Sequence, residues 1–89
     1  MAYFIIYTPE FKRDYKKLSD TLKEQLKLKG SLFEQNPFHP VLRTHKLSGR
    51  LRGNWSFSID FKHRVIFQFI NTQEILLLRA GDHSVYRNK

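Results

Sequence analysis

The spacing of apolar residues along this chain of 89 residues predicts one strand followed by two helices. Residues 2–7 form an apolar run that suits a strand. Apolar residues then recur every three or four positions, which is the repeat of a helix with one buried face. The stripe consists of Phe11, Tyr15 and Leu18 in the first helix and Leu22, Leu26 and Phe33 in the second.

Capping residues predict where each helix begins and ends. The pair Thr8-Pro9 suits a helix start, because threonine caps a helix and proline fits its first position. The pair Ser19-Asp20 interrupts the stripe and is expected to begin the second helix. Pro37 ends it, since the residue before a proline avoids helical geometry. Lys29 falls near the middle of the second apolar stripe, and Gly30 weakens that helix.

The second half of the chain predicts an antiparallel meander of three strands. Residues 36–44 contain two prolines and little periodicity, so they are expected to form a loop. The repeat then becomes two, with Trp55, Phe57 and Ile59 on a dry face and Ser56, Ser58 and Asp60 on a wet one. Apolar strands follow at residues 65–70 and 74–80, separated by turns at 61–63 and 71–73.

These elements predict an α+β fold of order β-α-α-β-β-β, in one domain that spans residues 1–89. An antiparallel helical hairpin is expected to pack against the sheet. Both faces of the last two strands carry apolar residues. The helices should therefore cover one face, while the other is only partly wet.

Composition predicts a metal-free intracellular protein. The chain has no cysteine, and its four histidines are not arranged as a short ligand pair, so we expect no metal and no cofactor. The apolar N-terminus lacks a charged leader and a cleavage site, and no apolar run approaches the roughly 18 residues of a membrane span. The expected location is the cytoplasm, with no membrane partner.

Positive charge is concentrated in the second part of the chain. The net charge is +8, of which residues 1–35 carry +2 and residues 36–89 carry +6. Such a field attracts a polyanion through counterion release and speeds the encounter with it. The alternative is that the charge serves only solubility.

Two groups of basic residues are candidates for phosphate contacts. Lys46, Arg50 and Arg52 lie in a glycine-containing segment that leads into Trp55. We assign Trp55 to the core, because it alternates on the same face of the predicted strand as Phe57 and Ile59. Arg64 begins an apolar strand, where it either snorkels at the sheet edge or projects into a site. Arg79 ends another apolar strand, so it either contacts phosphate or pairs with a carboxylate, the candidates being Asp60 and Asp82.

The segment after the last strand offers an imidazole and a phenol. His83 and Tyr86 lie three positions apart, in a loop of the kind that carries reactive side chains. The alternative is a surface histidine beside a tyrosine that covers the core.

Three motifs, read together, resemble the RelE/ParE superfamily of toxins from type II toxin–antitoxin systems. They are Leu47-Ser48-Gly49 to Gly53-Asn54-Trp55, His63-Arg64-Val65-Ile66-Phe67, and Gly81-Asp82-His83-Ser84-Val85-Tyr86. The helical hairpin after an N-terminal strand also fits, so the similarity spans nearly the whole chain. Some RelE-like members carry lysines and arginine where this chain has Ser56, Ser58 and Asp60, whereas its histidines are similar to the YafQ-like group.

The resemblance implies a metal-independent endoribonuclease that cleaves messenger RNA in the ribosomal A site. It implies that Arg64 stabilises charge on the phosphate, that His83 is the general acid and that Tyr86 orients or stacks the nucleotide. His45 or Lys46 would help to deprotonate the 2′-hydroxyl, which attacks phosphorus to give a 2′,3′-cyclic phosphate. The residues expected to contact RNA are Lys46, Arg50, Arg52, Lys62, Arg79 and Arg87.

The resemblance also implies a neutralising partner, a cognate antitoxin that wraps the basic surface with an acidic segment that is partly disordered before it binds. Two other functions stay open at this point. One is a ParE-like inhibitor of DNA gyrase without catalysis, and the other is a simple nucleic-acid-binding or corepressor module.

Overall fold

A computed structural model describes residues 2–86 of the chain and has the predicted α+β architecture. Its elements are β1 (Phe4–Tyr7), α1 (Pro9–Lys17), α2 (Asp20–Gln35), β2 (His45–Lys46), β3 (Trp55–Ser58), β4 (Arg64–Phe69) and β5 (Glu74–Gly81). Three short 3-10 helices are η1 (Pro40–Leu42), η2 (Gly49–Leu51) and η3 (His83–Tyr86). Within the described residues, no helix is long and apolar enough to span a bilayer.

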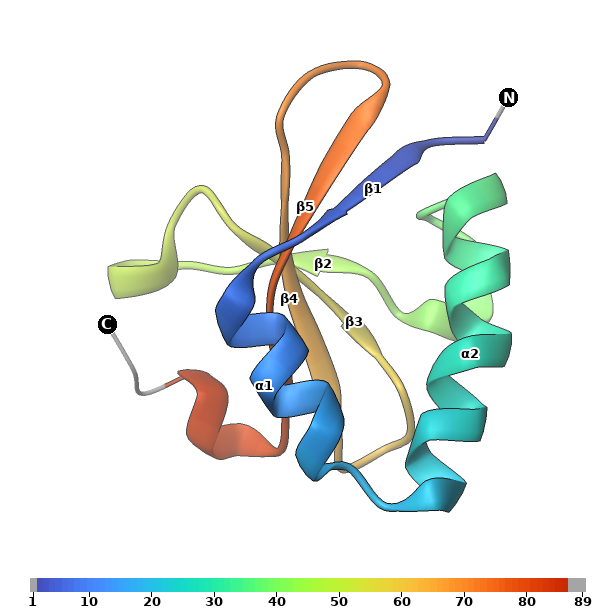
Figure 1. The fold of residues 1–89 in the computed structure, drawn as a ribbon. Coiled ribbons are helices and arrows are strands. Elements are labelled where there is room, and N and C mark those ends of the chain that lie inside the picture. Colours follow the sequence, from blue (N-terminus) through green and yellow to red (C-terminus); the bar gives the residue numbers. More distant parts are fainter. Residues whose placement is uncertain (1, 87–89) are drawn as a thin grey trace.

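The strands form one sheet in the order β1-β5-β4-β3-β2 (Figure 1). The predicted antiparallel meander of β3, β4 and β5 is confirmed. The sequence pattern did not predict that β1 pairs with β5 in parallel, with Ile5 opposite Ile75. It also missed β2, because His45 and Lys46 are both exposed and show no apolar alternation.

The predicted helix starts are confirmed. The Thr8 hydroxyl oxygen accepts a hydrogen bond from the Phe11 N–H at 3.0 Å and donates to the Leu77 carbonyl at 3.0 Å, so the cap also attaches α1 to β5. Ser19 caps α2 by accepting from the Leu22 N–H at 3.2 Å. α2 ends at Gln35, before the proline that was expected to stop it.

Aromatic packing joins the helices to one face of the sheet. The Phe33 ring of α2 stacks on Phe57 with centroids 4.4 Å apart and meets Phe67 edge-on at 4.8 Å. All three side chains are buried, and Trp55 packs against the same cluster, as its parity predicted. Each buried side chain of this size stabilises the fold by about 1.5–3 kcal/mol, and α1 and α2 lie along this layer in Figure 1.

The prediction that Ser56 and Ser58 face water is wrong, since both are buried. The reason is that η3 folds over this second face of the sheet. Tyr86 of η3 shares a 2.9 Å hydrogen bond with the Ser56 hydroxyl, and Val85 is 4% exposed. Gly81 allows the close approach, because a Cβ there would lie 3.0 Å from a Val85 methyl group.

The expected partners of Arg79 are also wrong. Its guanidinium pairs with Asp14 of α1, with Nε 2.7 Å from Oδ2 and Nη2 3.2 Å from Oδ1. The Ala80 N–H donates to the same carboxylate at 2.9 Å. Burial raises the pKa of Asp14, but the bonds from Arg79 and Ala80 outweigh burial and hold that pKa below its ordinary value. Neither Asp60 nor Asp82 pairs with Arg79, because the chain brings α1 to this end of β5.

We expect Asp14→Asn to lower the free energy of unfolding at pH 7 by about 1–3 kcal/mol, because it removes the charge that Arg79 and the Ala80 N–H contact. The pKa of Asp14 is lowered by folding, so its stabilisation is present above about pH 4 and is lost as pH falls through the folded-state pKa. Urea unfolding between pH 7 and pH 2 should show the two stabilities converging at the acid end.

Glu24→Gln is the matched control, since Glu24 is exposed on α2. It should change stability by less than about 0.5 kcal/mol. A constant gap between wild type and Asp14→Asn over the whole pH range would contradict the assigned role of the carboxylate.

Candidate active site

A cavity of about 360 Å³ brings together the four residues that the sequence nominated for catalysis. Its lining consists of His45, Leu47, Ser48, Leu51, Arg64, His83 and Tyr86. These residues come from β2, the connection through η2, the start of β4 and η3. The η2 connection and η3 lie together at the left of Figure 1, away from α2.

Backbone contacts determine which nitrogen of His45 is available to a substrate. Its Nδ1 lies 3.1 Å from the Arg43 carbonyl, and a carbonyl oxygen only accepts hydrogen bonds. The Nδ1–H therefore donates, and in the neutral ring Nε2 is the nitrogen with the lone pair. Because the ring is exposed at the cavity, Nε2 of the neutral tautomer is the nitrogen that can accept a proton from a substrate.

Arg64 is partly exposed at the start of β4, and the preceding turn holds one end of its guanidinium. Nη1 donates to the Asp60 carbonyl at 2.7 Å and to the His63 carbonyl at 3.2 Å. Among residues 2–86, the other two nitrogens of this guanidinium have no hydrogen-bond partner. The remaining edge of the fork can therefore meet two oxygens of a phosphate group.

His83 and Tyr86 face each other across one turn of η3, with ring centroids 5.4 Å apart and planes at 85°. Tyr86 is anchored through its hydroxyl to Ser56, whereas the His83 side chain is exposed. Asp82 starts the turn by accepting from the Ser84 N–H at 3.0 Å. The hydrogen bonds from the Ser84 N–H and hydroxyl, followed by the electrostatic effect of His63 and Lys62, lower the pKa of Asp82.

The predicted RNA-contacting residues divide into three sets. Lys46, Arg50, Arg52 and Lys62 are exposed, and the Lys46 ammonium lies 5.7 Å from the centre of the Trp55 ring. Arg79 is committed to Asp14, so the structure favours its ion pair over a phosphate contact. Arg87 lies outside the described residues.

The structure adds residues that the sequence did not nominate. Leu47, Ser48 and Leu51 line the cavity, and Ser56 supports Tyr86 from inside the sheet. Short alternating patterns give no signal for such contacts, because the partners are 30 residues apart. Within residues 2–86, no group of three histidine or acidic side chains is placed to hold a metal ion.

The family model for the bacterial toxin of type II toxin–antitoxin systems, YafQ, matches residues 3–87. No curated protein matches this chain. The match covers the helices, the sheet and the whole cavity.

Solved structures with the same fold include a free toxin and two toxin–antitoxin complexes. YafQ from Escherichia coli strain BL21(DE3) is 20% identical, with a TM-score of 0.76 over 97% of this chain and 99% of its own. The E. coli DinJ–YafQ toxin–antitoxin complex is 18% identical, with a TM-score of 0.78 over 99% of this chain and 100% of its own. The RelBE2 toxin–antitoxin complex of Mycobacterium tuberculosis is 19% identical, with a TM-score of 0.75 over 93% of this chain and 100% of its own.

We expect Tyr86→Phe and Ser56→Ala each to lower the free energy of unfolding by about 0.5–1.5 kcal/mol, because each removes the bond that fastens η3 to the sheet. The double variant should lose no more than about the larger single effect, as measured by urea unfolding. Fully additive losses would show that the two hydroxyls do not act on each other.

Proposed function

This chain belongs to the YafQ family of bacterial toxins from type II toxin–antitoxin systems, and from that premise we propose that it is an endoribonuclease that cleaves messenger RNA on the ribosome. The observation that carries the proposal is the convergence of Arg64, His45, His83 and Tyr86 on one open cavity. A guanidinium, two imidazoles and a phenol are sufficient for RNA cleavage by the neighbouring 2′-hydroxyl.

In the proposed reaction, Nε2 of His45 removes the proton of the 2′-hydroxyl, whose oxygen attacks the adjacent phosphorus. The bond from phosphorus to the 5′ oxygen breaks, and His83 gives that oxygen a proton. The products are a 2′,3′-cyclic phosphate and a free 5′-hydroxyl. The free edge of Arg64 stabilises the charge on the phosphoryl oxygens, an effect worth about 10²–10³ in rate.

Binding of RNA is assigned to the exposed basic residues around this cavity. Lys46, Arg50 and Arg52 lie beside or within the η2 connection, three residues of which line the cavity. They supply phosphate contacts, while the Tyr86 ring orients a base. Use of a 2′-hydroxyl as nucleophile makes RNA the substrate and excludes DNA.

We expect Arg64→Ala and His83→Ala each to reduce the rate of mRNA cleavage at least 100-fold and to abolish growth arrest, because each removes a group that acts on the reacting phosphate. Stability should change by less than about 0.5 kcal/mol for His83→Ala, since that side chain is exposed. Primer extension on translated transcripts measures the cut sites and their frequency.

Two matched controls lie away from the cavity. Arg13→Ala removes an exposed arginine of α1, and His39→Asn replaces a histidine that caps η1 with another capping side chain. Both should cut normally. Normal cutting by Arg64→Ala and His83→Ala would refute the site, whereas inhibition of gyrase supercoiling by a wild type that leaves mRNA intact would favour the ParE-like function.

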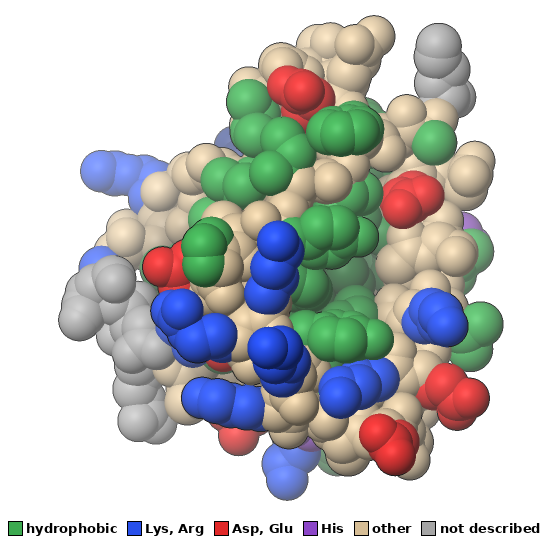
Figure 2. Space-filling model, in the orientation of Figure 1, with side chains coloured by type: hydrophobic (Ala, Val, Ile, Leu, Met, Phe, Trp, Pro, Cys, Tyr) green, Lys and Arg blue, Asp and Glu red, His purple; other side chains and the backbone are tan. Residues whose placement is uncertain are grey.

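We further propose that a cognate antitoxin binds the opposite face of the sheet. A groove of about 660 Å³ runs between α1, α2 and the sheet. Its apolar lining includes Ile5, Phe11, Leu26, Phe33, Phe57 and Leu77. Figure 2 shows this apolar floor with lysine and arginine side chains along its border.

Three exposed lysines of the two helices, Lys12, Lys16 and Lys27, line the groove and determine the kind of partner that fits it. An amphipathic helix with an apolar face and acidic flanks would bury its apolar side chains and meet these lysines. The DinJ–YafQ and RelBE2 structures are complexes of toxins with antitoxins, which supports such a partner.

We expect Lys12→Glu, Lys16→Glu and Lys27→Glu, combined in one variant, to weaken antitoxin binding at least tenfold and to leave RNA cleavage intact. Charge reversal on the rim repels the acidic partner. Combined Lys46→Glu, Arg50→Glu and Arg52→Glu should show the reverse pattern, with weak RNA binding and normal antitoxin binding. Calorimetric titration measures the affinity, and equal effects of both variants on the antitoxin would contradict this surface.

A further inference from the structure

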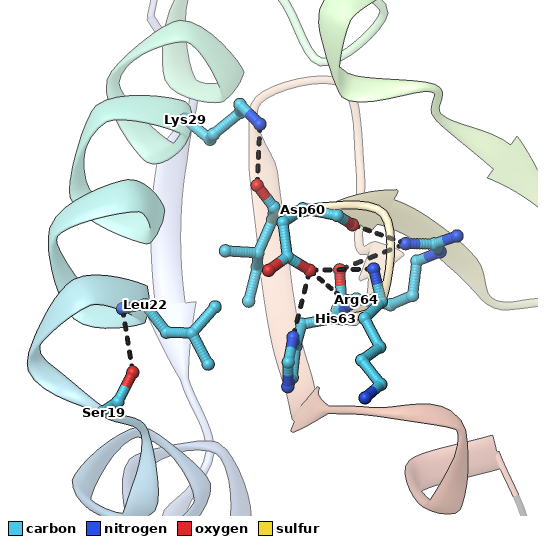
Figure 3. A network of polar contacts seen from close by, with 8 residues as sticks. Ser19, Leu22, Lys29, Asp60, His63 and Arg64 are labelled. Atoms are coloured by element: carbon cyan, nitrogen blue, oxygen red, sulfur yellow. Dashed lines mark hydrogen bonds and ion pairs between the residues drawn. The ribbon is translucent and has the colours of Figure 1, made fainter.

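Three polar residues that the proposed reaction does not use surround the turn between β3 and β4. They are Lys29, Asp60 and His63, and Figure 3 shows them converging on this turn from α2 and from the turn itself. Lys29 is the lysine that interrupts the apolar stripe of α2. The inference below rests on the proposed function, because it concerns how Arg64 is held.

The carboxylate of Asp60 determines the shape of the turn. Its Oδ1 accepts from the Lys62 N–H at 2.8 Å, the His63 N–H at 2.7 Å and the His63 ring at 3.0 Å. Burial raises the pKa of Asp60, but these bonds outweigh it and lower the pKa, so the acceptor is ionised at neutral pH. The Ile59 N–H also donates to the His63 carbonyl, at 2.8 Å, and closes the turn.

Lys29 attaches the same turn to the helical layer. Its ammonium donates to the Ile59 carbonyl at 2.7 Å, and the two residues are 30 positions apart in the sequence. Ile59 is fully buried, so its carbonyl is held on one side by packing and on the other by a charged donor. The position of the turn relative to α2 is therefore restrained.

The backbone of this turn then holds the guanidinium of Arg64. The two carbonyls that accept from Nη1 of Arg64 belong to Asp60 and His63, the residues that the Asp60 carboxylate bridges. An arginine side chain has about 2 kcal/mol of rotamer entropy, so its guanidinium is not oriented unless something fixes one end. A misplacement of about 1 Å at a reacting group can cost 100-fold in rate.

We propose that Asp60 is a positioning residue that aims the Arg64 guanidinium into the cavity, with Lys29 fixing the turn to α2. Asp60 acts on the substrate only through Arg64. Its effect therefore falls on the chemical step and vanishes when Arg64 is absent.

The test compares Asp60→Ala with Asp60→Asn in single-turnover cleavage of RNA by the full chain. Asp60→Ala should lower the rate about 10- to 100-fold with less than about a threefold change in KM. Asp60→Asn should stay within about threefold of wild type, because an amide oxygen accepts the same N–H bonds. In an Arg64→Ala background, Asp60→Ala should cost nothing further.

Lys29→Met is a second variant that leaves the turn's own hydrogen bonds in place, with Lys23→Met on the same helix as its control. It should slow cleavage several-fold, and Lys29→Arg should restore the rate. If Asp60→Ala does not fold, this pair decides the proposal. Wild-type rates in Asp60→Ala or Lys29→Met, or a full further loss in the Arg64→Ala background, would overturn it.

An NMR measurement separates this inference from the proposed function. If the wild type does not cleave RNA, the proposed function fails, and the Arg64 side-chain Nε–H resonance still reports positioning. Its order parameter should fall in Asp60→Ala and stay at the wild-type value in Asp60→Asn. An unchanged order parameter in Asp60→Ala would refute the positioning role.

Discussion

Burial of the central strands on both faces is the constraint on which the rest of this structure depends. Phe33 covers one face of β3 and β4 by stacking on Phe57. On the other face, Ser56 and Ile66 are buried because η3 packs there and Tyr86 bonds to Ser56. Since η3 also carries His83, the packing that completes the core places a titratable group beside the start of β4.

Two arginines at the ends of neighbouring strands show how local structure separates stability from chemistry. Arg79 places one edge of its guanidinium, Nε and Nη2, on a buried carboxylate, which joins α1 to β5. Arg64 donates from one nitrogen to two backbone carbonyls. They orient the side chain without neutralising its charge. A carboxylate partner removes most of the attraction for phosphate, whereas carbonyl partners leave the positive charge in place.

The groove and the cavity lie on opposite faces of one sheet. The groove is lined by helix-side residues such as Phe57 and Leu77, and the cavity by Tyr86, which bonds to the other face. A partner seated only in the groove therefore leaves the cavity uncovered. Neutralisation by an antitoxin then requires either a second antitoxin segment that reaches around the sheet to the cavity, or an antitoxin large enough to block access to the target sterically.

Periodicity and capping residues determined the helices, their ends, the three-stranded meander and the core position of Trp55, because these features follow from contacts between near neighbours. The sequence also nominated His45, Arg64, His83 and Tyr86, which the fold brings to one cavity. Only the tertiary structure decided the parallel pairing of β1, the burial of Ser56, the partner of Arg79 and the role of Lys29. Each of these depends on which distant segment arrives at a given surface, and a repeat of two or of 3.6 residues holds no information about that arrival.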